Sequence, residues 1–344
     1  MITLRDRYQG CLLGGAVGDA LGAGIEFLSL AKIRRRNGPE GVIGYVTAYG
    51  RTGAITDDTQ MTLFTAEGLL RDQQRPPGSR DPAAAIWPAS RRWLATQSGY
   101  APDGSWLSSQ DFLRHNRAPG TTCVSAVRAG RPGTVSHSLN HSKGCGGVMR
   151  VAPIGLADGD PFTLGCEAAA LTHGHPSGYL AAGALALMVS ELISGRDLRA
   201  AAAIAIRKLE HADHSAEVTA ALKAAVRAAE LRPLSADEIG ILGEGWTGEE
   251  ALAIATHCAL TATTFRSGVL HAVNHSGDSD STGAICGNLL GAALGAVAID
   301  EDLLAGLEGR DVISQVAEDL CDVFADGQRP SIERYPPEEE EDDG

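Results

Sequence analysis

Apolar residues recur every three or four positions through most of the chain, which is the spacing of helices that bury one face. Runs with the two-residue alternation of a half-buried strand are few, and the best of them, residues 42–46, is too short to supply a central sheet. The predicted helices span residues 8–21, 59–70, 162–172, 178–193, 198–209, 215–229, 248–262, 265–274, 282–297 and 311–324. The pattern therefore predicts an all-α fold.

Segments rich in Pro, Gly and Ser separate these helices, as expected for loops. They are residues 73–79, 99–104, 117–133 and 231–244. None of them is long or biased enough for a linker between domains, and no fixed-period repeat indicates a solenoid. Two apolar segments, residues 178–193 and 283–299, approach membrane-spanning length, but both are rich in Gly and Ala. We therefore expect buried helices and no membrane partner.

Glycine occupies every fourth position of the first predicted helix and of part of a late one. The residues are Gly10, Gly14, Gly18 and Gly22, and then Gly287, Gly291 and Gly295. This spacing places each set on one helix face. Each interior Gly costs about 1 kcal/mol relative to Ala. We therefore expect another backbone to pack closely against these faces, with the approach of a ligand as the alternative.

The net charge of the 344-residue chain is −14, and an acidic run at residues 338–343 contributes six of those charges. We expect a single domain at residues 1–335 and a disordered acidic tail at 336–344. The one basic cluster is short, at residues 34–36, which argues against a nucleic-acid partner. Seven Cys residues without a C-x-x-C pair, and an N-terminus without a signal segment, favour the reducing cytoplasm.

Two aspartate clusters each precede an apolar helix: residues 56–59 (TDDT) and 276–282 (SGDSDST). Adjacent carboxylates repel unless a cation or a helix N-terminus offsets their charge. Simple helix capping is the alternative interpretation of each cluster alone. The second cluster offers hard oxygen ligands on alternate residues, which suits Mg²⁺ or Ca²⁺, but it lacks the twelfth-position acid of an EF-hand. Together the clusters could hold two hard cations roughly 3.5–4 Å apart.

A Gly-rich loop, residues 142–147 (SKGCGG), lacks the spacing of a phosphate loop or a dinucleotide fingerprint. Its four unhindered N–H groups could nevertheless cradle a diphosphate, although such loops are often only turns. His173 and His175, and then His271 and His275, could bind a soft metal. Because no Cys lies at zinc spacing, we instead expect ligand hydrogen bonds or capping. No G-x-S-x-G sequence indicates a serine hydrolase.

The chain resembles the ADP-ribosylglycohydrolase family in segments that follow the family's order from about residue 5 to 300. They are residues 10–22 (GCLLGGAVGDALG) with Glu26 and Phe27, 56–59 (TDDT), 117–120 (RAPG), 143–150 (KGCGGVMR), 172–173 (TH), Trp246 with 249–252 (EEAL), and 277–281 (GDSDS). The chain departs from the family at Ser279 and Ser281, where Thr is frequent, and at residues 121–122 (TT), where relatives often carry Asn.

The resemblance implies a compact, multi-helix orthogonal bundle with two Mg²⁺ ions, or Mn²⁺, at the bottom of a cleft. The implied metal ligands are Thr56, Asp57, Asp58, Asp278, Asp280 and Ser281. The implied diphosphate ligands are Ser142, Gly144, Gly146 and Gly147, and His173 would contact the adenosine side. Glu26 would gate the cleft or handle a proton, with Asp57 and Asp58 as rivals for the proton-transfer role.

The implied activity is hydrolysis of the glycosidic bond between ADP-ribose and a modified protein side chain, with arginine as the expected linkage. An O-linked ADP-ribose is the alternative substrate: a serine conjugate, O-acetyl-ADP-ribose or poly-ADP-ribose. A catalytically silent ADP-ribose-binding relative is the non-enzyme alternative. We expect an ADP-ribosylated protein or conjugate as partner and a monomer in solution.

Overall fold

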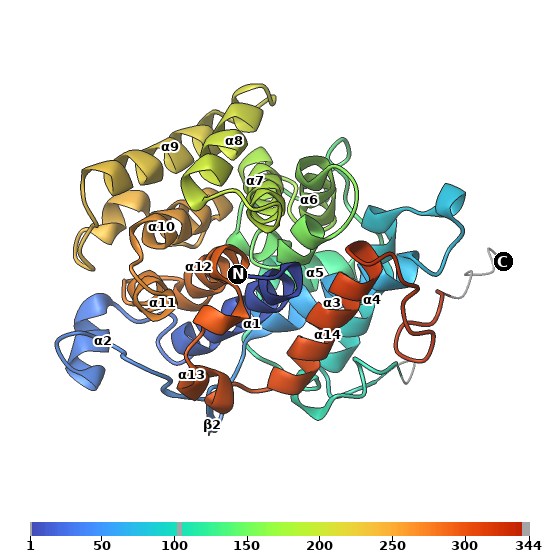
Figure 1. Ribbon diagram of the computed structural model, residues 1–344, viewed down its shortest axis with the longest axis horizontal. Coiled ribbons are helices and arrows are strands. Elements are labelled where there is room, and N and C mark those ends of the chain that lie inside the picture. Colours follow the sequence, from blue (N-terminus) through green and yellow to red (C-terminus); the bar gives the residue numbers. More distant parts are fainter. Residues whose placement is uncertain (1, 102–104, 339–344) are drawn as a thin grey trace.

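The computed structural model describes residues 2–101 and 105–338 and consists of packed helices (Figure 1). The long helices are α1 (Leu4–Gly22), α3 (Asp57–Asp72), α4 (Pro82–Thr96), α6 (Pro161–Ala170), α7 (Pro176–Ile193), α8 (Leu198–Glu210), α9 (Ala216–Leu231), α10 (Gly248–Thr261), α12 (Ser279–Leu294) and α14 (Arg310–Phe324). The short ones are α2 (Leu30–Asn37), α5 (Thr121–Arg128), α11 (Phe265–Val273) and α13 (Glu301–Gly306). The prediction of an all-α fold is confirmed.

Each predicted helix is present, but four others are not visible in the sequence pattern. Helix α4 contains Pro88 in its interior, and α2 has three consecutive arginines with only Leu30 and Ile33 buried. Helix α5 lies inside the predicted loop at residues 117–133, and α13 has six residues. Residues 42–46 form no strand. The described part of the chain instead has a short antiparallel hairpin of two strands with two residues each, β1 (Thr47–Ala48) and β2 (Arg51–Thr52).

Helices α1 and α12 lie antiparallel near the middle of the fold, with their glycine faces in direct contact (Figure 1). The facing pairs are Gly10 with Gly291, Gly14 with Gly287, and Gly18 with Gly283. A methyl group on any of these residues would overlap a backbone carbonyl of the opposite helix. The prediction of close backbone packing is therefore confirmed. At the far end of the contact, Gly22 packs against the backbone of Asp280.

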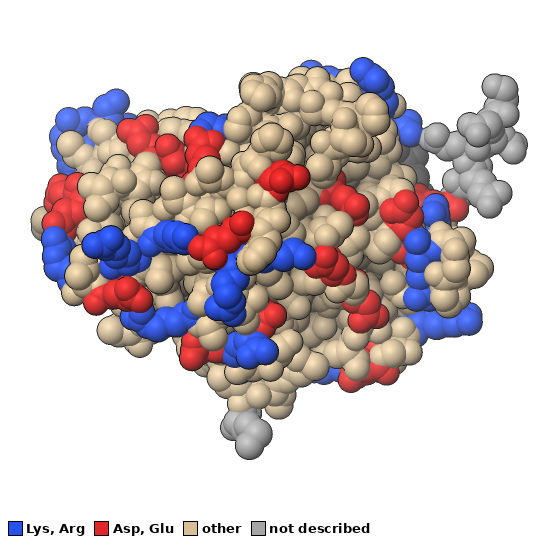
Figure 2. Space-filling model, turned by 90° about the horizontal axis from the view of Figure 1, so that it is seen from above, with Lys and Arg blue, Asp and Glu red and all other residues tan. Residues whose placement is uncertain are grey.

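The remaining helices cover this central pair. Figure 1 shows α8, α9 and α10 on one side and α3, α4 and α14 on the other. Among the described residues, α7 is the one helix long and apolar enough to cross a membrane, and 72% of it is buried inside the fold. It packs against α6, α8, α10 and α12, as a core helix does. On the face drawn in Figure 2, acidic and basic side chains are interspersed.

The predicted tail begins at Pro336, and its first residues lie against the body of the protein. Glu338 pairs with Arg92 of α4 at 2.8 Å, and its carboxylate lies 3.7 Å from the Arg71 guanidinium of α3. Arg92 also reaches Glu67, which is fully buried. Residues 339–344 of the predicted tail lie outside the described residues, so the tail boundary remains a prediction.

We expect Gly287→Ala to destabilise the protein by about 1–3 kcal/mol, the usual cost of overpacking a core. Helix propensity alone would give the opposite sign, since Ala is favoured over Gly by about 1 kcal/mol. Chemical denaturation of both proteins measures the difference. Gly240→Ala is the matched control, because no atom of the described residues, apart from the adjacent ones in the chain, lies within 4 Å of a methyl group there. A stabilised Gly287→Ala variant would contradict the close backbone contact.

Candidate active site

Three helix ends meet at one place: the end of α1 and the starts of α3 and α12. The Asp19 side chain, fully buried on α1, fixes the start of α3. Its carboxylate accepts hydrogen bonds from the N–H groups of Thr56 at 3.0 Å and Thr59 at 3.1 Å. It also accepts one from the Thr59 hydroxyl at 2.5 Å. The contact of Gly22 with Asp280 sets the start of α12 beside it. The two aspartate clusters are thereby brought together.

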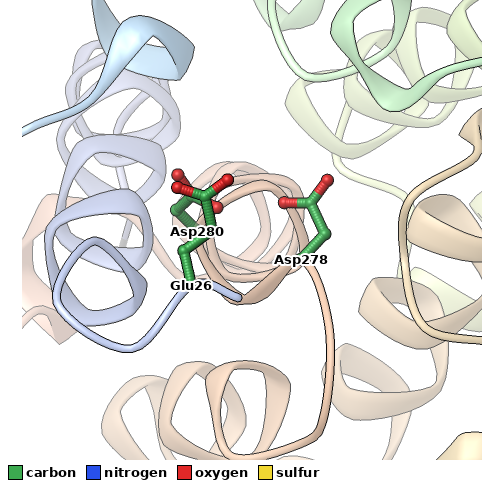
Figure 3. Close-up of side chains that lie close together, drawn as sticks. All are labelled: Glu26, Asp278 and Asp280. Atoms are coloured by element: carbon green, nitrogen blue, oxygen red, sulfur yellow. The ribbon is translucent and has the colours of Figure 1, made fainter. Parts of the chain in front are cut away.

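The carboxylates of Glu26, Asp278 and Asp280 converge at this point. One oxygen from each lies within 4.8 Å of the other two. Figure 3 shows the Glu26 and Asp280 carboxylates close together, with Asp278 opposite them. Asp57 and Asp58 line the same cleft from the start of α3. The site therefore gathers five acidic side chains from three separate parts of the chain.

Hydrogen bonds account for only some of the carboxylate oxygens. Asp57 Oδ2 accepts from the Gly120 N–H at 3.2 Å, and Asp278 Oδ1 accepts from the Ser281 N–H at 3.3 Å. Asp58 Oδ1 is buried and has no hydrogen-bond partner among the described residues. Leaving a buried charged oxygen unpaired is costly. The side-chain atoms of these acids that could bind a metal are all oxygens, which is the ligand set of a hard cation such as Mg²⁺. The residues therefore fit a magnesium-type centre.

Burial raises the pKa of each of these five acids, and for four of them the neighbouring carboxylates raise it further. Burial, followed by the charge of Asp280, raises the pKa of Asp57, Asp58 and Asp278 well above the usual range. Burial and the neighbouring aspartates raise the pKa of Glu26 to about 11. The N-termini of α3 and α12 offset part of this repulsion. Protons or a cation must offset the rest of the repulsion, because four buried aspartates and the half-buried Glu26 cannot all be ionised together.

The acids lie on the wall of a cleft of about 330 Å³. Nine of the predicted site residues line it: Glu26, Asp57, Asp58, Gly144, Gly146, His173, Asp278, Asp280 and Ser281. Thr56, Ser142 and Gly147 do not. Thr56 caps α3, accepting a hydrogen bond from the Asp58 N–H. Ser142 contacts the Thr122 hydroxyl, and Gly147 packs against the Ala169 side chain.

The Gly-rich loop is fixed by the segment that precedes α10. The Cys145 N–H donates to the Trp246 carbonyl at 3.1 Å, and the Gly248 N–H donates to the Lys143 carbonyl at 2.8 Å. The Gly144 N–H is directed at the Ser142 hydroxyl, 3.3 Å away. We predicted that four N–H groups of this loop could bind a diphosphate. Two of them, those of Gly144 and Cys145, already have acceptors within the protein.

His173 stands behind the Gly-rich loop with its ring close to Gly144 and Gly146. Its Nδ1 lies 2.8 Å from the Thr172 hydroxyl, which also accepts a hydrogen bond from Arg150. Burial and the Arg150 charge lower the His173 pKa to about 3. The ring is therefore neutral, and its second nitrogen can form one hydrogen bond with a ligand in the cleft.

The other three histidines considered as metal ligands, His175, His271 and His275, have partners within the protein. His175 caps α7, accepting a hydrogen bond from the Ser177 N–H. His275 lies between the Ser276 carbonyl and the Thr282 hydroxyl, each 2.8 Å away. His271 packs edge-on against His257. The capping and hydrogen-bonding interpretation of these residues fits their observed contacts.

Several residues of the cleft were not predicted as site residues. Phe27 and Trp246 line the cleft, and their rings stack with centroids 5.3 Å apart. Both residues occur in the segments that resemble the family, but neither was predicted as a site residue. Phe27 has a left-handed φ of 63°, which is unusual for a bulky residue. Cys145 lies with its Sγ 2.7 Å from Asp278 Oδ2. Burial and the Asp278 charge raise the pKa of this thiol.

Without a divalent cation, we expect stability to fall as the pH rises from about 5 to 7. Burial holds the pKa of Asp19 at about 7, against about 3.9 in an unfolded chain. The folded state then binds more protons than the unfolded state in this interval, so each rise in pH favours unfolding. An added divalent cation should oppose the loss. Thermal unfolding with and without chelator measures it, and a pH-independent Tm in chelator would contradict the expectation.

Asp19→Asn should weaken divalent-cation binding by about 10- to 100-fold, the usual loss when a residue that orients metal ligands is removed. The amide can no longer accept all the hydrogen bonds that hold Thr56 and Thr59. Calorimetric titration with Mn²⁺ measures the affinity. Asp197→Asn is the control, because Asp197 caps the exposed start of α8. Unchanged affinity in folded Asp19→Asn would show that the first cluster holds its own geometry.

Known proteins resemble this chain in both sequence and fold. Residues 1–330 match the ADP-ribosylglycohydrolase family. The ADP-ribosyl-[dinitrogen reductase] glycohydrolase of Rhodospirillum rubrum is 29% identical over 317 residues, covering 89% of this chain and 92% of that protein. An uncharacterized protein of Archaeoglobus fulgidus is 27% identical over 334 residues, covering 93% of this chain and 97% of that protein.

A solved structure described as an ADP-ribosylglycohydrolase-related protein complex superposes with a TM-score of 0.65 and 28% identity. The match covers 92% of this chain and 97% of that one. The family match and the fold thus extend over nearly the whole chain, acidic cleft included. On these grounds the chain belongs to the ADP-ribosylglycohydrolase family and is a glycosyl hydrolase.

Proposed function

We propose that this protein is a Mg²⁺-dependent hydrolase that releases ADP-ribose from a modified side chain of a protein, with arginine as the linkage. The observation that carries the proposal is the gathering of four buried aspartates and the half-buried Glu26 on a cleft that also contains the Gly-rich loop. The relative named for ADP-ribosyl-dinitrogen reductase supports a protein substrate. The arginine linkage rests on the resemblance of the motifs to bacterial members of the family.

The cation site is proposed to comprise both aspartate clusters. The ligands would be Thr56, Asp57, Asp58, Asp278, Asp280 and Ser281. The unpartnered Asp58 Oδ1 and the all-oxygen donor set support hard cations, with two Mg²⁺ as the expected number and Mn²⁺ as a substitute. When bound, such cations would supply positive charge that orients the ribose hydroxyls and stabilises the developing charge of the reaction.

The side chains of the cleft divide the remaining tasks. Gly146 offers its backbone to the diphosphate, and His173 offers a neutral ring nitrogen to the adenosine side. Glu26 is the candidate for holding or moving the proton of the leaving group, since its raised pKa favours the protonated carboxyl. Asp57 and Asp58 are weaker candidates, because an oxygen of each already accepts a hydrogen bond from the protein.

The single-domain organisation at residues 1–335, the monomeric state and the cytoplasmic location belong to the same proposal. A monomeric enzyme with an open cleft can receive a modified side chain on the surface of another protein. The stacked Phe27 and Trp246 rings stand at the edge of that opening. The modified partner, not a nucleic acid, is the macromolecule that we expect to bind there.

The test is release of free ADP-ribose from an arginine-modified protein and, in parallel, from a serine-modified peptide, each with and without Mg²⁺. We expect Mg²⁺-dependent release from the arginine substrate. Asp278→Asn should lower turnover by about 100-fold or more, because it removes the charge of a metal ligand. Asp237→Asn is the control, since Asp237 forms a surface ion pair with Arg34.

The outcomes separate the alternatives. Release from the serine substrate alone would keep the site and replace the linkage with an O-glycosidic one. Binding of ADP-ribose without release from either substrate would favour the catalytically silent relative. Full activity in Asp278→Asn, with Mg²⁺ still required, would exclude the proposed ligand set.

A further inference from the structure

Glu308, in the turn between α13 and α14, is a buried carboxylate that the proposed function does not use. Its Oε2 accepts a hydrogen bond from the Ile55 N–H at 3.1 Å, and its Oε1 accepts one from the Arg117 guanidinium at 3.1 Å. The Glu308 N–H also donates to the Gly53 carbonyl at 2.9 Å. One acidic residue from the C-terminal part of the chain thus joins the segment that precedes α3 to the loop of residues 117–120.

The 117–120 loop holds Asp57 by both its backbone and its side chain. The Asp57 N–H donates to the Arg117 carbonyl at 3.2 Å, and Asp57 Oδ2 accepts a hydrogen bond from the Gly120 N–H at 3.2 Å. Between these two contacts, Ala118 lines the cleft and has a left-handed φ of 57°. Such a backbone conformation persists only where the surrounding structure holds it. The position of Asp57 therefore depends on how this loop is anchored.

The buried Arg117 side chain is the anchor of the loop, and Glu308 is its partner. Among the described residues, Arg117 Nε and Nη1 have no hydrogen-bond partner, so the bond from Nη2 to Glu308 is the one that holds the guanidinium. The guanidinium also lies over the Tyr49 ring, 4.9 Å from its centroid. Removing one partner of a buried ion pair leaves the other charge uncompensated. The loop is therefore expected to shift when Glu308 loses its charge.

We propose that Glu308 is a positioning residue of the active site, which sets Asp57 for cation binding by holding the 117–120 loop and the segment that precedes α3. Glu308 acts through the Arg117 guanidinium on one side and the Ile55 N–H on the other, and it contacts neither cation nor substrate. The inference rests on the proposed cation centre. It adds a fourth part of the chain to the three that carry the acids of the cleft.

The test is calorimetric titration of the full-length protein with Mn²⁺, without substrate. Glu308→Gln should weaken Mn²⁺ binding by about 10- to 100-fold, the usual loss when a residue that orients metal ligands is changed. Asp319→Asn is the matched control, because Asp319 is a comparably buried carboxylate that bonds Arg334 and Tyr335 of the C-terminal segment instead. It should keep the wild-type affinity for Mn²⁺. Thermal unfolding confirms that both variants are folded.

A second comparison tests the route through Arg117. Arg117→Gln should weaken Mn²⁺ binding by a factor similar to that of Glu308→Gln. The double variant should lose no more affinity than the weaker-binding single variant, because residues that act as one unit are not additive. If the two losses multiply in the double variant, Glu308 does not act through Arg117 and the inference is wrong.

Unchanged Mn²⁺ affinity in folded Glu308→Gln would overturn the inference. An equal loss in Asp319→Asn would overturn it as well, because the effect would then follow stability alone. If Glu308→Gln does not fold, Glu308→Asp keeps the charge on a shorter side chain and should bind Mn²⁺ about tenfold more weakly; unchanged affinity there has the same meaning. Absence of Mn²⁺ binding to the wild-type protein would overturn both this inference and the proposed cation centre. Mn²⁺ binding without ADP-ribose release from either substrate would contradict the proposed function alone.

Discussion

Helices α1 and α12 approach so closely along their glycine faces that the backbone of one fills the space where the other would carry side chains. This contact fixes more than the core. It sets Gly22 against Asp280 and so determines where the second aspartate cluster begins. Asp19, one turn earlier on α1, then holds the first cluster through the N–H groups of Thr56 and Thr59. The relative position of all five acids therefore depends on one helix pair.

The site places these acids under strong mutual repulsion, and the fold opposes it with buried polar contacts. Asp19 uses its hydrogen bonds to position Thr56 and Thr59, while the N-termini of α3 and α12 direct partial positive charge at the cluster. Such an arrangement lowers stability in the absence of a counter-charge, as functional sites often do. The same repulsion would favour binding of the proposed cations in the cleft.

Sequence reasoning identified what local patterns encode. The glycine stripe predicted the backbone contact that the structure shows, whereas the assignment of the two aspartate clusters as hard-cation ligands stays a prediction. Both inferences used residues close together in the chain. The partner of the stripe, and the convergence of the clusters with Glu26, depend on packing across more than 200 residues. Asp19 escaped notice for this reason: in sequence it is one more residue in a small-residue helix, and only its buried contacts with Thr56 and Thr59 reveal its role.

The hydrophobic pattern missed helices that are stabilised by packing against the rest of the protein or that are too short to show a period. Helix α4 tolerates Pro88 because its buried residues, among them Trp93, pack against α3. Helix α5 is too short for a periodic signal to emerge from its flanking loops. The Cys145 thiol was invisible as a site residue since its neighbour Asp278 lies more than 130 positions away.

The pairing of the first long helix with one near the end of the chain has a consequence for biosynthesis. Helix α1 leaves the ribosome early, but its glycine face finds its partner only after α12 has been synthesised, some 260 residues later. Until then the glycine face of α1 is exposed, and the helix itself is only weakly stable because Gly has low helix propensity. We expect the active site to assemble late, after most of the chain is available, and the nascent chain to depend on protection from aggregation during that interval.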